Sequence, residues 1–140
     1  MKDNSEQDQK ENAPVVKLRS IREIIEDLKQ PIKARHVKTK PASKQGGKIK
    51  FIEWHTALLY LDHYAPGWSY SVRSVSLVGN LVAVIAAISI PCSEGVVTRE
   101  ATGCEEVSKK DYGDAVSNAE AMALKRAAAK FGLALYMYKK

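Results

Sequence analysis

Residues 119–132, AEAMALKRAAAKFG, decide the fold, because small helix-forming residues are combined there with a regular apolar stripe. Members of the stripe recur at helical spacing and lie on one side of the expected helix: Leu124, Ala127, Ala128 and Phe131. Gly132 stands where a left-handed residue ends a last turn, and Ser117 with Glu120 predicts a capping box at the start. We therefore expect a long helix that packs on a core.

The other side of this helix carries a compact group of cations, Lys125, Arg126 and Lys130. Arg126 and Lys130 are like charges at i, i+4 with no acid at matching spacing, which destabilises an isolated helix by roughly 0.2–0.5 kcal/mol. A polyanionic partner would offset that cost. A solubilising exposed face is the simpler interpretation, and the helix alone does not decide between the two.

Strand patterns fill the stretch before the helix. Residues 68–73 alternate apolar and polar side chains, but Val75 and Leu77 continue with the opposite parity. A one-residue change of parity moves every following side chain to the other face of a strand. The sequence therefore predicts a bulge or sharp bend near Ser74.

A meander of three antiparallel strands follows from the next segments. Residues 81–90 are apolar on both faces, as in a central strand that is covered on both sides, and residues 96–105 form the third strand with Gly103 at a bulge. One helical layer covers only one side of a sheet, so a neighbouring subunit is a candidate for covering the other. The predicted fold class is α+β, a three-stranded antiparallel β-meander packed on a long C-terminal helix, with an α-β-β-β-α core.

Two short helices and a basic segment precede the strands. Apolar spacing predicts helices at 20–29, with Ser20 as the N-cap, and at 53–64. Between them, residues 29–50 hold eight lysines and arginines and no acid, and their prolines and glycines predict a basic loop or distorted hairpin. Whether this segment contacts a ligand or is simply a solvated loop stays open at this point.

The N-terminal segment differs in composition from the rest. The first twelve residues hold four acids and few apolar side chains. This composition predicts a disordered leader at 1–19 and leaves 20–140 as a single domain. The leader lacks the apolar core of a signal peptide, and the longest apolar run is about half of what a membrane span requires. We expect no membrane association and a cytoplasmic location.

Charge and motif content narrow the function classes. The chain of 140 residues carries a net charge of +6, which favours a polyanionic partner. Cys92 and Cys104 are far apart without a metal-binding spacing, and a phosphate-binding Walker loop is missing. The histidines and acids form no catalytic or ligand pattern. We expect that the protein is not an enzyme and that it uses no cofactor, metal or nucleotide.

Five segments in this order resemble the Rad-fifty-two-type single-strand annealing proteins, especially the bacterial and phage relatives known as the DdrA family. The segments are IIEDLKQP at 24–31, GKIKFIEWH at 47–55, GWSYSV at 67–72, GVVTREATG at 95–103 and ALKRAAAKFGLALY at 123–136. The resemblance implies a ring- or helix-forming homo-oligomer that binds single-stranded DNA and anneals complementary strands without ATP, in DNA repair and recombination.

The resemblance also implies which residues contact DNA. The Lys-Arg pair of the family's helix faces the DNA backbone and corresponds to Lys125 and Arg126, while basic strand residues suggest Arg73 and Arg99. The remaining predicted contacts are cations of the last helix and of the basic segment: Lys130, Lys38, Lys40, Lys48 and Lys50. Tyr64 is the aromatic residue that we expect to be available for stacking on bases.

Other function classes fit parts of the pattern. A double-stranded RNA-binding module shares the αβββα order and a basic helix, although such modules are about half this length and place their cations at the helix start. A small enzyme and a purely structural oligomer are the further alternatives.

Overall fold

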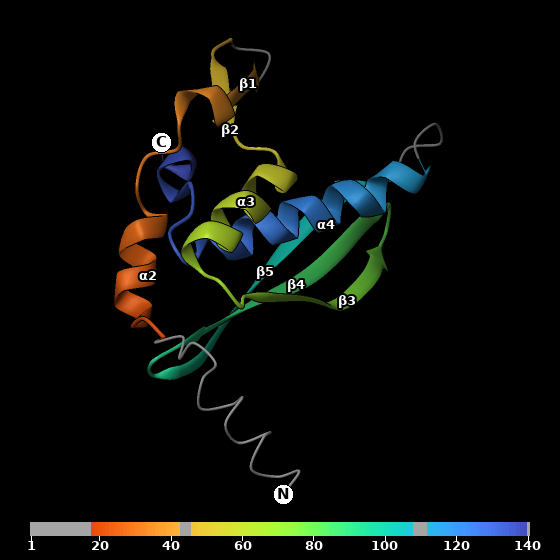
Figure 1. Cartoon of the computed structure of the whole chain (residues 1–140). Coiled ribbons are helices and arrows are strands. Elements are labelled where there is room, and N and C mark those ends of the chain that lie inside the picture. Colours follow the sequence, from red (N-terminus) through yellow and green to blue (C-terminus); the bar gives the residue numbers. More distant parts are fainter. Residues whose placement is uncertain (1–17, 43–45, 108–111, 140) are drawn as a thin grey trace, which may run out of the picture.

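The computed structural model describes residues 18–42, 46–107 and 112–139, whose arrangement is shown in Figure 1. In chain order the described elements are α2 (Ile21–Leu28), the 3-10 helix η1 (Ala34–His36), β1 (Lys38–Pro41), β2 (Lys48–Phe51), α3 (Trp54–Tyr64), β3 (Ser69–Val78), β4 (Leu81–Cys92), β5 (Gly95–Glu106), α4 (Tyr112–Ala129) and the 3-10 helix η2 (Leu135–Tyr138). The predicted α+β class is confirmed.

The meander is present as predicted. Strands β3, β4 and β5 form one antiparallel sheet in that order, and the register of β3 on β4 shifts between Val72 and Ser74. The extra residue, Arg73, is the bulge that the change in apolar parity predicted. Beyond the bulge, Val75 and Leu77 lie on the same face of the sheet as Val72. All three pair with buried residues of β4 that share one face.

Helix α4 lies directly on β4 and β5 (Figure 1). Helix and sheet come very close at Gly103, where an added Cβ would come within 2.0 Å of the Ala119 carbonyl oxygen and 2.6 Å of the Ala123 nitrogen. The β4–β5 register continues through Gly103 without a shift, so the predicted bulge at this residue is wrong. Gly103 is needed because the helix backbone occupies the space of a side chain.

The start of α4 also differs from the prediction. The helix already begins at Tyr112, so Ser117 and Glu120 lie inside it and do not cap its N-terminus. Burial explains the longer helix, because Ala115 and Ala119 pack against Val82 and other small residues of β4. Tertiary packing thus extends the helix beyond the local capping signal.

The C-terminal end of α4 agrees with the sequence. Gly132 has a φ of +109°, its N–H donates to the Ala129 carbonyl, and the Leu133 N–H donates to the Ala128 carbonyl. These two bonds form a Schellman motif with Gly132 as the left-handed residue. An added Cβ at Gly132 would also come within 2.7 Å of Lys29, so this turn sits close to the end of α2.

The main core lies between α2, α3, the last turns of α4 and the adjoining end of the sheet. Its largest fully buried side chains include Phe131, Leu28, Leu61 and Ile88. Ser20 caps α2 as predicted, because its Oγ accepts from the Glu23 N–H at 3.2 Å. The folded unit begins slightly before residue 20, since Arg19 pairs with Asp27 and its carbonyl accepts from the Ser93 N–H. Residues 1–17 of the predicted leader lie outside the described residues.

Strand β3 is an edge that α4 does not cover. Val72, Val75 and Leu77 lie opposite the buried Ala86, Val84 and Val82 of β4, yet they are 41%, 56% and 64% exposed. The second face of β4, expected to be covered, is also partly open, with Leu81 39% exposed. Among the described residues, no segment covers this apolar strip on one edge of the sheet.

The basic segment is a hairpin. Strands β1 and β2 pair antiparallel from Lys38 opposite Phe51 to Pro41 opposite Lys48, and the hairpin projects from one end of the helical layer (Figure 1). Residues 43–45 of the connecting loop are outside the described part. No helix in the described ranges is long and apolar enough to cross a membrane.

The contact at Gly103 gives a direct test of the fold. Replacing Gly103 by Ala should lower the free energy of unfolding by about 3 kcal/mol or more, because the new Cβ meets helix backbone that cannot move without shifting α4. Thr102→Ala, at the exposed neighbouring position, is the control and should change stability by less than about 1 kcal/mol. Urea unfolding measures both variants, and equal stability of Gly103→Ala and wild type would contradict this packing.

Candidate nucleic-acid interface

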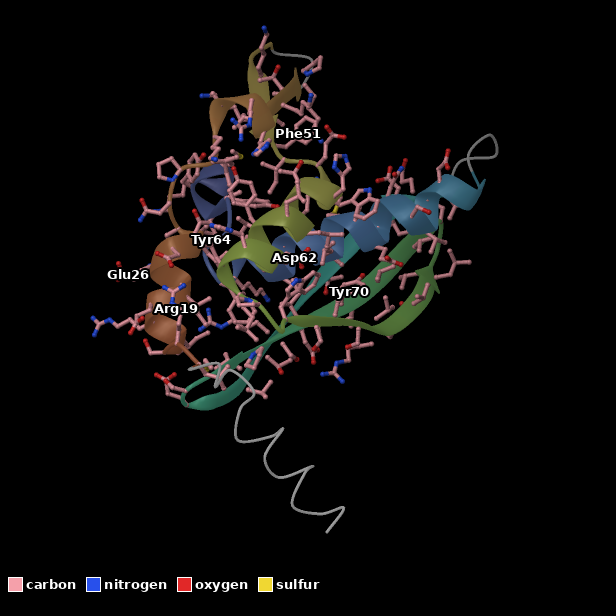
Figure 2. All side chains as sticks on the ribbon, in the orientation of Figure 1. Arg19, Glu26, Phe51, Asp62, Tyr64 and Tyr70 are labelled. Atoms are coloured by element: carbon pink, nitrogen blue, oxygen red, sulfur yellow. The ribbon has the colours of Figure 1, made fainter. Side chains whose placement is uncertain are left out.

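A cleft of about 640 Å³ lies between the hairpin, the start of α3, α4 and η2. Cations from two distant parts of the sequence line it, namely Lys40 and Lys50 of the hairpin and Lys125 and Arg126 of α4. Figure 2 shows Phe51 at the base of the hairpin, next to the helical layer. The fold thus brings four of the predicted contact residues to one concave surface.

The periodicity of α4 determines which residues reach the cleft. Asn118, Ala121, Met122 and Lys125 all line it and recur at i, i+3, i+4 and i+7, so they form one stripe along the helix. The alanines of a different stripe, including Ala119 and Ala123, face the sheet and are fully buried. Seating α4 on the sheet therefore fixes the direction in which Lys125 points.

Lys125 is a cation of the cleft whose pKa is lowered by its surroundings. Its ammonium lies 5.4 Å from the centre of the Phe51 ring, and the Lys40 ammonium lies 5.1 Å from the same ring. Burial lowers the pKa of Lys125, the nearby Lys40 lowers it further, and Glu53 opposes the change. Two like charges beside one aromatic ring favour a nearby anion, because the anion offsets both the repulsion and the desolvation.

The acids of the cleft only partly balance these charges. Glu53 and Glu105 line it, but Glu53 is already engaged by Lys38 at 3.9 Å and by the His55 Nε2 at 2.9 Å. Lys38, a predicted contact residue, thus pairs with an acid at the rim and does not line the cleft. Lys48 is exposed on the hairpin and also lies outside the cleft lining.

Arg126 lines both the cleft and a smaller hollow at the edge of β5. One of its guanidinium nitrogens donates to the Thr102 carbonyl at 3.2 Å, which leaves its other donors for a ligand. Tyr138 lines the same two hollows and is half-exposed; its partial burial raises its pKa, and Arg126 opposes the rise.

Two predicted contact residues, Arg99 and Lys130, form hydrogen bonds between β5 and the end of α4. The Lys130 ammonium donates to the Glu100 carbonyl, and the Arg99 guanidinium donates to the Lys130 carbonyl. Arg99 also lies 4.8 Å from the centre of the Phe131 ring. These bonds join the last turn of α4 to the sheet, so the structure gives Arg99 and Lys130 a packing role and does not bring them to the cleft.

Arg73 lies away from the cleft altogether. It sits at the β3 bulge, and its Nε is 3.5 Å from a carboxylate oxygen of Glu100, across the neighbouring strand β4. Of the nine predicted cations, Lys40, Lys50, Lys125 and Arg126 are therefore brought together, and Arg73, Arg99, Lys130, Lys38 and Lys48 are not.

Aromatic residues of the cleft were missed by the sequence analysis. Phe51, Trp54 and Tyr138 line it, whereas Tyr64, the predicted stacking residue, packs against the main core. Helical spacing gave no signal for Trp54, because it shares the stripe of the buried Ala57 and Leu61. Its exposure is not evident from this spacing, because Thr56 and Ala57 in the same turn of α3 are buried.

Comparison with known proteins shows the family of the chain. Residues 20–140 match the family described as "Rad52/22 family double-strand break repair protein". The chain belongs to the Rad52/22 family. It is 38% identical over 122 residues to "DNA repair RAD52-like protein 1, mitochondrial" and 40% identical over 123 residues to "DNA repair RAD52-like protein 2, chloroplastic", both from Arabidopsis thaliana. Each match covers 86% of this chain, and the chain spans 68% and 61% of those two relatives.

Membership of the Rad52/22 family confirms the resemblance seen in the sequence. The assignment to its bacterial and phage branch stays a prediction. The expected cytoplasmic location is contradicted, because the names of both plant relatives place them in organelles. The expectation was based on the absence of an apolar signal sequence, which does not distinguish cytoplasm from mitochondrion or chloroplast.

Proposed function

We propose that the cleft binds the backbone of single-stranded DNA and that the protein promotes annealing of complementary strands without ATP. The supporting observation is the convergence of Lys40 and Lys50 from the hairpin with Lys125 and Arg126 from α4 on one concave surface. Both plant relatives are named as DNA repair proteins, which fits this activity. The family match favours it over a double-stranded RNA-binding module.

Phosphate contacts suit annealing for a physical reason. Lysine and arginine hold a strand by its phosphates and leave the base edges free to test a second strand for complementarity. Binding of this kind carries little sequence preference. It requires no bond-breaking step, so the expectation that the protein is not an enzyme remains part of the proposal.

The charge of the cleft sets the expected salt dependence. Each phosphate neutralised on a single strand contributes a slope of about −0.7 in log affinity against log salt, so four contacts give about −2.8. Between about 50 and 200 mM salt this amounts to a loss of about fiftyfold. A variant with two of the four cations should show a slope of about −1.4 per protomer.

We also propose that copies of the chain associate through the uncovered strip on β3. Val72, Val75 and Leu77 expose apolar surface on the helix-facing side of an edge strand, where a second copy would remove it from water. The β5 edge is less open to strand addition, because Arg126 and Lys130 occupy the Thr102 and Glu100 carbonyls. Association of many copies, in a ring or a filament, would place their clefts along one strand of DNA.

The binding proposal is tested with Lys125→Ala combined with Arg126→Ala. Fluorescence anisotropy with a labelled oligothymidine should show most of the affinity lost and the salt slope about halved. An annealing assay without nucleotide should slow in parallel. The matched control, Arg22→Ala with Lys33→Ala, removes two exposed cations that do not line the cleft and should bind like wild type. A folded double variant that binds and anneals normally would refute the site.

Self-association is tested with Val75→Ser combined with Leu77→Ser. Light scattering at micromolar concentration should give a mass far above the 15.5 kDa of one chain for wild type and a mass close to it for the variant. Val96→Ser is the control, because Val96 is 67% exposed at the far end of the sheet. A monomeric wild type would exclude the oligomer, and an unchanged mass of the variant would exclude β3 as the contact.

A further inference from the structure

Trp54 is an unusual residue for the wall of a charged cleft. It is the first residue of α3, lines the cleft and is 49% exposed, whereas Ala57 and Leu61 on the same stripe are fully buried. Large aromatic side chains bury most of their surface in a folded chain. The indole is therefore not used as a core residue within this chain.

The indole is held in place from one side. The His55 ring lies edge-on to it, with ring centres 5.7 Å apart at 81°, and the His55 Nε2 is 2.9 Å from a Glu53 carboxylate oxygen. Glu53 directly precedes α3 and also pairs with Lys38 of the hairpin. These contacts link the start of α3 to the hairpin and place the His55 ring beside the indole.

The wall of α4 that lines the same cleft contains short and apolar side chains beside its cations. Asn118, Ala121 and Met122 precede Lys125 and Arg126 along it, and Ala121 has only a methyl side chain. Met122 is partly held by the sheet, since its sulfur accepts from the Cys104 N–H at 3.4 Å. The remaining space carries an aromatic surface on one wall, an amide and a thioether on the other, and cations around it.

We propose that Trp54 stacks on an unpaired base of the strand whose phosphates the cleft holds. The inference rests on the proposed function, because the cations that would bring the strand to Trp54 are those of the phosphate site. Stacking uses the face of the base and leaves its pairing edge free, so it is compatible with annealing. It is also tolerant of sequence, since every base has a π-face.

The charges around Trp54 favour nucleic acid over a second protein copy as its partner. The lining holds Lys40, Lys50, Lys125 and Arg126 against Glu53 and Glu105, and Glu53 is already paired. An identical surface of another copy would bring like charges together. A strand of DNA instead supplies phosphates for the cations and bases for the indole.

An abasic oligonucleotide separates the two kinds of contact. It keeps the phosphates of oligothymidine of the same length and lacks the bases. Wild type should bind oligothymidine at least about fivefold more tightly than the abasic strand, and Trp54→Ala should lose most of this difference while keeping its affinity for the abasic strand. Trp54→Phe should retain part of the difference, because it keeps a flat ring. Leu59→Ala is the control, since Leu59 is 59% exposed on α3 and does not line the cleft.

Several results would overturn the inference. Trp54→Ala could bind both oligonucleotides like wild type, weaken both equally, or change the mass in light scattering without changing the preference for bases. The first and third results would leave the phosphate site intact and remove any base contact by Trp54. Equal weakening would assign Trp54 to the structure of the cleft and not to stacking. Failure of wild type to bind either oligonucleotide would instead refute the proposed function and the inference with it.

Discussion

The contact between Gly103 and the backbone of α4 is the constraint on which the rest of the structure depends. Only a residue without a side chain lets the Ala119 carbonyl and the Ala123 nitrogen come so close to β5. Because alanines line the same face of α4, the helix lies low on the sheet, and the stripe that ends in Lys125 is turned toward the hairpin. A larger residue at Gly103 would lift the helix and with it one wall of the cleft.

Local signals were sufficient for most of the fold. The parity change before Val75 gave the bulge at Arg73, and Gly132 gave the end of α4. The predicted start of α4 was wrong. Ser117 and Glu120 form a valid capping signal, but burial of Ala115 extends the helix beyond it. Gly103 was assigned to a bulge because a glycine in a strand fits either a bulge or a close approach, and sequence does not show what packs against it.

The candidate site was predictable only in part, because a positive charge does not reveal its partner. Lys125 and Arg126 were named from the helix and do line the cleft. Arg99 and Lys130 carry the same charge but donate to backbone carbonyls and join α4 to the sheet. The sequence predicted a basic loop or distorted hairpin and left open whether it contacts a ligand, and only the folded hairpin beside α4 shows Lys40 next to Phe51. Long-range contacts of this kind leave no periodic pattern.

The proposed function requires a DNA strand in the cleft between the hairpin and α4. Lysine footprinting tests it directly: the wild-type protein, alone and saturated with oligothymidine, is treated with an amine-reactive ester and analysed by mass spectrometry. The structure predicts that Lys40, Lys50 and Lys125 lose reactivity when DNA is bound, while Lys29 and Lys33, which are exposed and do not line the cleft, keep theirs. Unchanged reactivity of the three cleft lysines under saturating DNA would contradict the claim.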